Sequence, residues 1–173
     1  GVGPLSISPS LYKKLPYDAA RDFLPLTRVA EIINVMVINP SIGVGDAKRF
    51  IDWTKKRSAD VRFGSSGTGQ FDHLVGEFFQ RKAGIRMTHV PYKGGGPALI
   101  DMVSGDIQVM FATYVTAVPH IRGGRLRAIA VSTPQRQALL PDLPAVGEVI
   151  PGFGASNWNG MFAPAKTPRQ IAD

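Results

Sequence analysis

Hydrophobic residues follow two different spacings in the middle of the chain. Phe71, Leu74, Val75, Phe78 and Phe79 recur every three or four positions, which places them on one face of an α-helix. Short apolar runs rich in β-branched residues, such as IINVMVI, have instead the length and composition of buried strands. The predicted strands are residues 32–38, 61–64, 87–90, 107–111 and 126–131, and the predicted helices are residues 47–57, 97–103, 114–122 and the segment that begins at Phe71.

Strands and helices alternate along this stretch with short connections between them. Glycines mark the expected helix ends at Gly84, Gly105 and Gly123-Gly124, where a left-handed residue commonly follows the last turn. Such alternation is typical of an α/β fold. We therefore predict a mainly parallel sheet with right-handed crossovers and helices that flank it.

The two ends of the chain lack this periodicity. Prolines interrupt residues 1–31 and residues 133–173, so we predict mostly loops in both segments. A one-turn helix is expected at residues 10–15 and a short strand at residues 160–163. These two segments look like extended parts of a larger structure.

Length and composition exclude several classes. The 173 residues suffice for one sizeable domain, or for one domain and an incomplete second. The absence of cysteine excludes disulfides, thiolate metal sites and a cysteine nucleophile. No apolar run is long enough for a membrane-spanning helix. Gly1 is not an initiator methionine, so we expect a processed or partial chain whose compartment cannot be read from its first residues.

The formal net charge of +7 raises the question of a nucleic-acid partner. The basic residues are scattered over predicted helices and turns, and the aromatic residues are not interleaved with them. A nucleic-acid binder would combine both features on one surface. We therefore interpret the basic residues as solvated and expect no nucleic-acid partner.

Three short loops follow predicted strands and precede predicted helices. In open α/β sheets, ligands bind beyond the carboxyl ends of the strands, and helix N-termini carry free N–H groups that attract anions. Hydroxyls, glycines and one lysine fill these loops, so we predict a small-anion site there, with ordinary capped turns as the alternative. The candidate ligand-binding residues are Ser65, Ser66, Gly67, Thr68, Gly69, Tyr92, Lys93, Gly94, Ala112 and Thr113.

The sequence does not match the more specific motifs of known catalytic sites. No lysine follows Gly69 as a phosphate-binding P-loop requires, and Thr68 stands where a nucleophile elbow needs glycine. A triad of Ser66, His73 and Asp101 can be assembled only on paper, and the histidines lack metal-ligand spacing. We expect no metal and no cofactor. A hydrolase or transferase that uses Ser66 or Thr68 as nucleophile remains the alternative function, and a base near either hydroxyl would favour it.

Several segments together resemble one known family, the substrate-binding receptors of tripartite tricarboxylate transporters, or Bug family. They cover nearly the whole chain in order, and they read LYKKLPYDAARDFLPLTRVA, FGSSGTG, HLVGEFF, HVPYKGGGPALIDMVSGDIQVMF, PHIRGGRLRAIAVST, LPDLPAVGE and NWNGMFAPAKTP. The HVPYKG and LPYD…RDF segments are the most specific of them.

The resemblance implies a periplasmic, non-enzymatic receptor with the two-lobed type II solute-binding fold. Its ligands would be small carboxylates, and its transient partners the membrane subunits of the transporter. The family's GSSG-type loop aligns with residues 64–69 and its YKG turn with residues 92–94, both on the second lobe. Many members carry Asp-Asn where this chain has Ala112-Thr113, which disfavours amino-acid ligands here.

The resemblance also implies that this chain is truncated at both ends relative to the family. Residues 42–132 would then form a complete second lobe, residues 1–41 a first-lobe fragment with the crossover strand, and residues 133–173 the return segment. With half of the cleft missing, we expect weak or absent ligand binding. We also expect self-association, because the buried strand 32–38 would present an unpaired edge. The exchange of terminal segments in a symmetric dimer is one form that this could take.

Overall fold

The computed structural model describes residues 1–57 and 60–172. The chain forms two compact units, of which one contains residues 33–156 and the other contains residues 1–32 together with the segment from Asn157 onward. Within the described residues, the helices are too short or too polar to cross a membrane.

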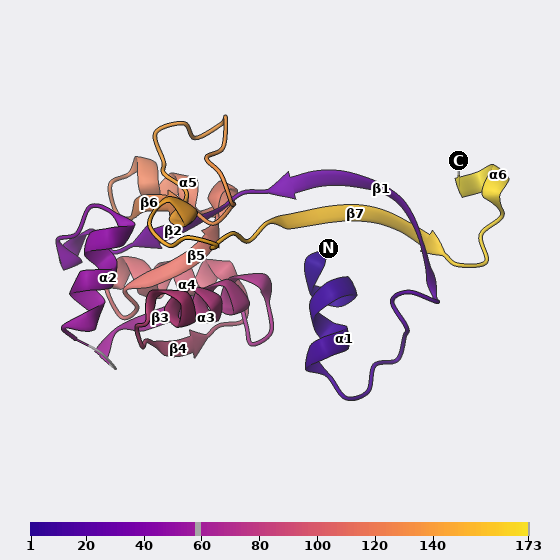
Figure 1. Cartoon of the computed structure of the whole chain (residues 1–173), viewed down its shortest axis with the longest axis horizontal. Coiled ribbons are helices and arrows are strands. Elements are labelled where there is room, and N and C mark those ends of the chain that lie inside the picture. Colours follow the sequence, from indigo (N-terminus) through magenta and orange to yellow (C-terminus); the bar gives the residue numbers. More distant parts are fainter. Residues whose placement is uncertain (58–59, 173) are drawn as a thin grey trace. The chain divides into compact units, whose positions relative to one another are not determined.

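The larger unit contains a five-stranded sheet with the order β4-β3-β5-β2-β6 (Figure 1). Strand β3 is parallel to its neighbours β4 and β5, whereas β2 is antiparallel to both β5 and β6. Four strands therefore run in one direction and β2 alone is reversed, so the mainly parallel α/β sheet is confirmed in mixed form. The strands are β2 (Asn34–Ile38), β3 (Arg62–Ser65), β4 (Thr88–Pro91), β5 (Val109–Thr113) and β6 (Arg127–Val131).

Helices cover both faces of this sheet, as the alternation of strands and helices predicted. On β2, Met36 and Ile38 belong to a core cluster that also contains residues of α2 and α3. Val35 and Val37 point to the opposite face and pack with residues of α4 and α5. The helices are α2 (Ala47–Lys55), α3 (Phe71–Ala83), α4 (Gly95–Ser104) and α5 (Tyr114–Arg122), and short 3-10 helices occur at Pro40–Ile42 and Val146–Glu148.

The helix boundaries follow from local chemistry. The Asp46 side chain caps α2 by accepting a hydrogen bond from the Arg49 N–H at 2.8 Å. Gly84 and Gly105 follow α3 and α4 in the left-handed conformation, which glycine adopts without a steric cost. The predicted Gly123-Gly124 pair follows α5, and Gly124 is its left-handed residue.

The smaller unit is built around a two-stranded antiparallel ribbon of β1 (Phe23–Ile32) and β7 (Asn157–Pro164). The loops predicted for residues 1–31 are therefore wrong for nine of these positions, residues 23–31, where proline had argued against a strand. Pro25 is tolerated because the register shifts directly after it. The unit also contains a π-helical turn at Gly3–Ile7, α1 (Ser8–Leu11) and α6 (Arg169–Ala172).

Two further predictions need correction. The helix expected at residues 10–15 lies earlier, because Pro4 and Pro9 occupy first-turn positions where a missing N–H costs nothing. The single strand predicted for residues 32–38 is divided between β1 and β2, which end and begin in different units.

Candidate functional site

The carboxyl ends of three adjacent parallel strands meet at one edge of the sheet. Strand β3 lies between β4 and β5, and each of the three strands is followed by a helix, namely α3, α4 and α5. The candidate residues from the sequence lie in these connections or, for Ser65, Ala112 and Thr113, at the ends of the strands that precede them. This edge is therefore the place where an α/β sheet of this kind binds a ligand.

The structure brings two of the candidate loops into direct contact. The Tyr92 N–H donates to the Ser65 carbonyl oxygen at 3.0 Å, and the Gly94 N–H donates to the Ser66 carbonyl oxygen at 3.1 Å. Ser65–Gly69 and Tyr92–Gly94 thus form one continuous surface. Thr113 lies at the end of β5, where it pairs with Asn34 of β2 rather than with the loop after β3.

None of the three helices that begin at this edge has a side-chain cap. Gln70, Gly94 and Thr113 occupy the N-cap positions of α3, α4 and α5, and none of their side chains accepts a hydrogen bond from the first turn. The first N–H groups of a helix have no partner within the helix and carry its partial positive charge. This arrangement leaves donors available for a small anion.

Ser66 is held by the carboxylate of Asp72, in the first turn of α3. Asp72 Oδ2 accepts from the Ser66 N–H at 2.7 Å, and Asp72 Oδ1 accepts from Ser66 Oγ at 2.8 Å and from the His73 N–H at 3.0 Å. Burial raises the pKa of Asp72 even though these hydrogen bonds act in the opposite direction. The Ser66 hydroxyl proton therefore points to Asp72 and is not available to a ligand.

Ser65 faces inward rather than toward solvent. Its side chain is fully buried, and its Oγ lies 2.6 Å from His89 Nε2. It also accepts from the Gly67 N–H at 3.2 Å. The Gly69 N–H donates to His73 Nδ1 at 3.1 Å. Much of the polar capacity of this loop is thus used to fix its own shape.

Thr68 and Lys93 differ from the other candidates because both are exposed. Within the described residues, the Thr68 hydroxyl has no hydrogen-bond partner and the Lys93 ammonium has no ion-pair partner. The Tyr92 hydroxyl donates to Asp101 Oδ2 at 2.8 Å, and burial together with this carboxylate raises the pKa of Tyr92 to about 12. The Ala112 side chain is buried in the core and cannot contact a ligand.

The geometry rules out a catalytic triad of Ser66, His73 and Asp101. His73 bonds to the Gly69 N–H, and Asp101 bonds to Tyr92. A carboxylate, Asp72, does lie within reach of Ser66, as the alternative function required, but both of its oxygens are already engaged by donors of the loop and helix. No histidine contacts Ser66 among the described residues, so nothing in this arrangement supports the hydrolase alternative.

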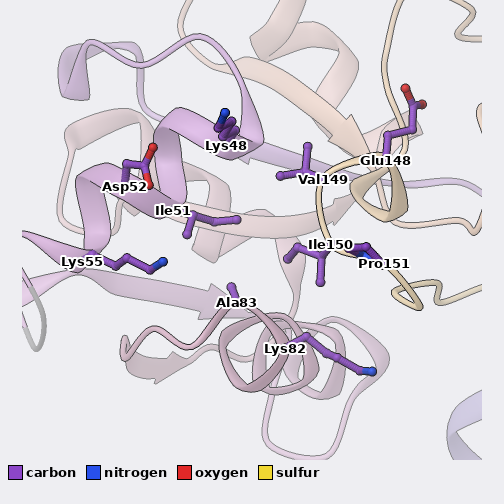
Figure 2. A pocket seen from close by; sticks show the side chains of 10 residues that line it. All are labelled: Lys48, Ile51, Asp52, Lys55, Lys82, Ala83, Glu148, Val149, Ile150 and Pro151. Carbon is purple, nitrogen blue, oxygen red and sulfur yellow. The ribbon is translucent and has the colours of Figure 1, made fainter.

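A hollow lies at the opposite end of α3 from the candidate loops. Its volume is about 520 Å³, and α2, the end of α3 and residues 148–151 line it. Figure 2 shows Lys55 extending toward Ala83 and Ile150, whereas Lys82 is directed away from Lys55. Glu148 is engaged by Arg136 at 2.9 Å, and this guanidinium lowers the pKa of the carboxyl. The hollow brings together no set of side chains that indicates a particular ligand.

Sequence reasoning missed the histidines of the site. The sequence pattern shows only that the histidines lack metal-ligand spacing, whereas in the structure the rings of His73 and His89 stack with centroids 4.0 Å apart. No local pattern could have revealed this contact, because it depends on the packing of α3 over β4. Among residues 1–57 and 60–172, His, Asp and Glu side chains are nowhere grouped in threes as metal ligands.

Comparison with known proteins gives a consistent result. The family model described as "Tripartite tricarboxylate transporter family receptor" matches residues 1–173. Protein BugT of Bordetella pertussis is 32% identical over 169 residues, which are 97% of this chain and 52% of that protein. This chain therefore spans about half the length of that relative.

Solved structures show the same relation. An adipate-bound protein of R. palustris superimposes with a TM-score of 0.86 at 31% identity, over 93% of this chain and 54% of its own. The malate-bound MatC of Rhodopseudomonas palustris gives a TM-score of 0.85 at 28% identity, over 99% of this chain and 58% of its own. The periplasmic binding protein BugD gives 0.86 at 28% identity, over 97% and 56%.

Proposed function

Since this chain belongs to the family of tripartite tricarboxylate transporter receptors, we propose that it contributes one lobe of a periplasmic receptor for small carboxylates. In this proposal the protein binds and delivers its ligand and catalyses no reaction. Its transient partners are the membrane subunits of the transporter.

The observation that supports this proposal is the set of uncapped helix N-termini at one edge of the sheet. Three helices begin beside adjacent strands, and no N-cap side chain accepts from their first turns, although Asp72 engages the His73 N–H of α3. Thr68 adds a free hydroxyl and Lys93 a positive charge at the same edge. A carboxylate matches such a site because it accepts several hydrogen bonds and carries the opposite charge.

The ligand class follows from the charges at the edge. Adipate and malate occupy two of the solved relatives, and both are dicarboxylates. The strand β5 ends in Ala112-Thr113, which offers no carboxylate to pair with an ammonium group. We therefore propose dicarboxylates rather than amino acids as ligands.

The lobe assignment is part of the proposal. Residues 42–132 contain four of the five strands and all four long helices of the larger unit, which supports their assignment to the second lobe. Residues 1–41 and 133–173 would provide pieces of the first lobe and the return to it. The ribbon unit joins residues 1–32 to residues 157–172, whereas residues 33–41 and 133–156 belong to the same compact unit as residues 42–132.

Isothermal titration of the full-length receptor with malate and adipate tests the function. Thr68→Ala should weaken binding by about 1.5–3 kcal/mol, the usual contribution of a hydrogen bond to a charged group. Ser66→Ala should weaken binding less directly, because it removes a contact with Asp72 that fixes the loop. The double variant should remain folded, since both side chains lie on a loop.

Lys93→Gln and Lys55→Gln provide a matched pair of charge removals. Lys93 lies at the candidate edge, whereas Lys55 lines the hollow at the opposite end of α3, so only Lys93→Gln should reduce affinity. Unchanged affinity in both Thr68→Ala and Lys93→Gln would remove this edge from the ligand site. If neither malate nor adipate binds the unmodified receptor, the proposed ligand class is refuted.

A further inference from the structure

A stacked pair of histidines supports the candidate loop from the core side. His73 of α3 and His89 of β4 lie with their ring centroids 4.0 Å apart and their planes 28° apart. Phe63 of β3 stacks on His89 at 4.8 Å. The pair is therefore held between a core aromatic residue and the loop that follows the same strand.

His73 accepts a hydrogen bond that depends on its protonation state. Because the Gly69 N–H donates to His73 Nδ1 at 3.1 Å, this nitrogen must carry a lone pair. The proton of the neutral ring is then on Nε2, which lies 3.8 Å from Glu77 Oε1. An imidazolium would carry a proton on Nδ1 as well and could no longer accept from Gly69.

His89 is linked to the same loop through Ser65. Ser65 has one hydroxyl proton, which can point to His89 Nε2 at 2.6 Å or to the Gly67 carbonyl oxygen at 3.2 Å. A protonated His89 must donate from Nε2, and this forces the hydroxyl proton toward Gly67. The protonation of either ring thus changes a hydrogen bond of the loop.

We propose that His73 and His89 are positioning residues for the Ser65–Gly69 loop, and that the pair takes up a proton when an anion occupies the loop. Carboxylate affinity should accordingly rise as the pH falls. This inference rests on the proposed function, because the anion in question is the carboxylate ligand.

The physical reason is that protonation of His73 helps an anion in two ways. It releases the Gly69 N–H from its bond to Nδ1, so this donor becomes available to the ligand. It also places a positive charge beneath the loop, where a bound carboxylate is attracted to it. By linkage, the bound anion must raise the affinity of the pair for a proton to the same extent.

The surroundings favour the neutral form of His89. Burial and the neighbouring His73 lower the pKa of His89, whereas Glu77 acts in the opposite direction. Asp72 is close in sequence, but its carboxylate is engaged by Ser66 and by the backbone of His73. The other charged groups on these elements are all exposed, and they are Arg62 of β3, Arg81 and Lys82 of α3, and Lys93 of the turn after β4.

Two conservative variants separate titration from hydrogen bonding. In His73→Asn, the side-chain oxygen takes the place of Nδ1 and still accepts from Gly69, but it cannot be protonated. In His89→Gln, the amide takes the place of Nε2 and retains a contact with Ser65. His120→Gln removes the remaining histidine of the chain, in α5, and serves as the control.

Malate affinity measured from about pH 8 to about pH 6 tests the proposal, because imidazole protonation begins in this range while both malate carboxyls stay largely ionised. The unmodified receptor and His120→Gln should bind several-fold more tightly at the lower pH, since a pKa that rises by about one on binding approaches a factor of ten only below the ligand-free pKa. His73→Asn should lose most of this dependence, and His89→Gln should reduce it. A flat profile in the unmodified receptor, or an unchanged slope in both variants, overturns the proposal.

A ligand-free measurement distinguishes this failure from that of the proposed function. In NMR spectra, the Gly69 amide shift should follow the His73 titration, and neutral His73 should carry its proton on Nε2. A Gly69 amide that does not titrate with His73 overturns the proposal without any ligand. Absence of malate and adipate binding at every pH refutes the proposed function instead.

Discussion

At the residue scale, most polar groups of the candidate loop form hydrogen bonds that stabilise the loop's own conformation. Ser66 is held by Asp72, Ser65 by His89, and the Gly69 N–H by His73. A loop fixed in this way loses little conformational entropy when a ligand binds. The donors left over for a ligand are then few and well placed, with Thr68 as the exposed hydroxyl.

A single glycine sets the distance between α3 and β3. A Cβ on Gly76 would clash with the ring of Phe63, and Phe63 is a core residue that also stacks on His89. We expect Gly76→Ala to lower the free energy of unfolding by about 1–3 kcal/mol, because overpacking outweighs the better helix propensity of alanine. Equilibrium denaturation in urea measures the change.

Gly96→Ala is the matched control for this prediction. Gly96 also lies in a helix, α4, and a Cβ there would meet no atom within 4 Å. This variant should show no loss of stability. Equal destabilisation by the two substitutions would contradict the packing argument.

At the element scale, apolar patterns located the strands but misplaced their starts. The predicted strands begin at Val61, Met87, Ile107 and Leu126, and each of these residues is buried just before its ladder begins. Hydrophobicity reports burial, whereas strand bounds report hydrogen-bond pairing. Helix ends were located better because the left-handed residues Gly84 and Gly105 have a direct conformational cause.

The direction of β2 could not be predicted from its sequence. Its five residues are buried on both faces, so the run carries no signal that distinguishes a parallel from an antiparallel neighbour. The candidate loops could be predicted, because their residue types and their place after strands are local features. The contacts beneath them could not, since His73 and His89 meet only after α3 packs over β4.

Hydrogen exchange should separate the two kinds of sheet in this molecule. Strand β2 is buried and paired on both sides, whereas β1 and β7 pair only with each other and are largely exposed. We expect the β2 amides to exchange at least about a hundredfold more slowly than those of the ribbon, because isolated two-stranded ribbons open readily. Comparable protection in both would contradict this expectation.

At the scale of the whole molecule, the exposed apolar surface lies elsewhere than the sequence indicated. The unpaired edge predicted for residues 32–38 is wrong, because β2 pairs with β5 on one side and β6 on the other. The ribbon instead exposes Leu26, Val29 and Met161, which are 38%, 60% and 57% accessible. Its two strands each retain an outer edge without a partner in the described sheet.

We therefore expect the 173-residue chain to self-associate through the terminal segments that form this ribbon. Burial of the exposed side chains and pairing of the open edges both favour contact with a second copy, and a symmetric dimer satisfies both at once. Light scattering at increasing concentration measures the molecular mass. Val29→Lys combined with Met161→Lys should shift the population toward monomer, whereas Leu139→Lys, which changes an exposed leucine of the other unit, should leave it unchanged. A monomer at high concentration would show that the ribbon remains solvated, and an equal effect of all these substitutions would indicate association without a specific surface.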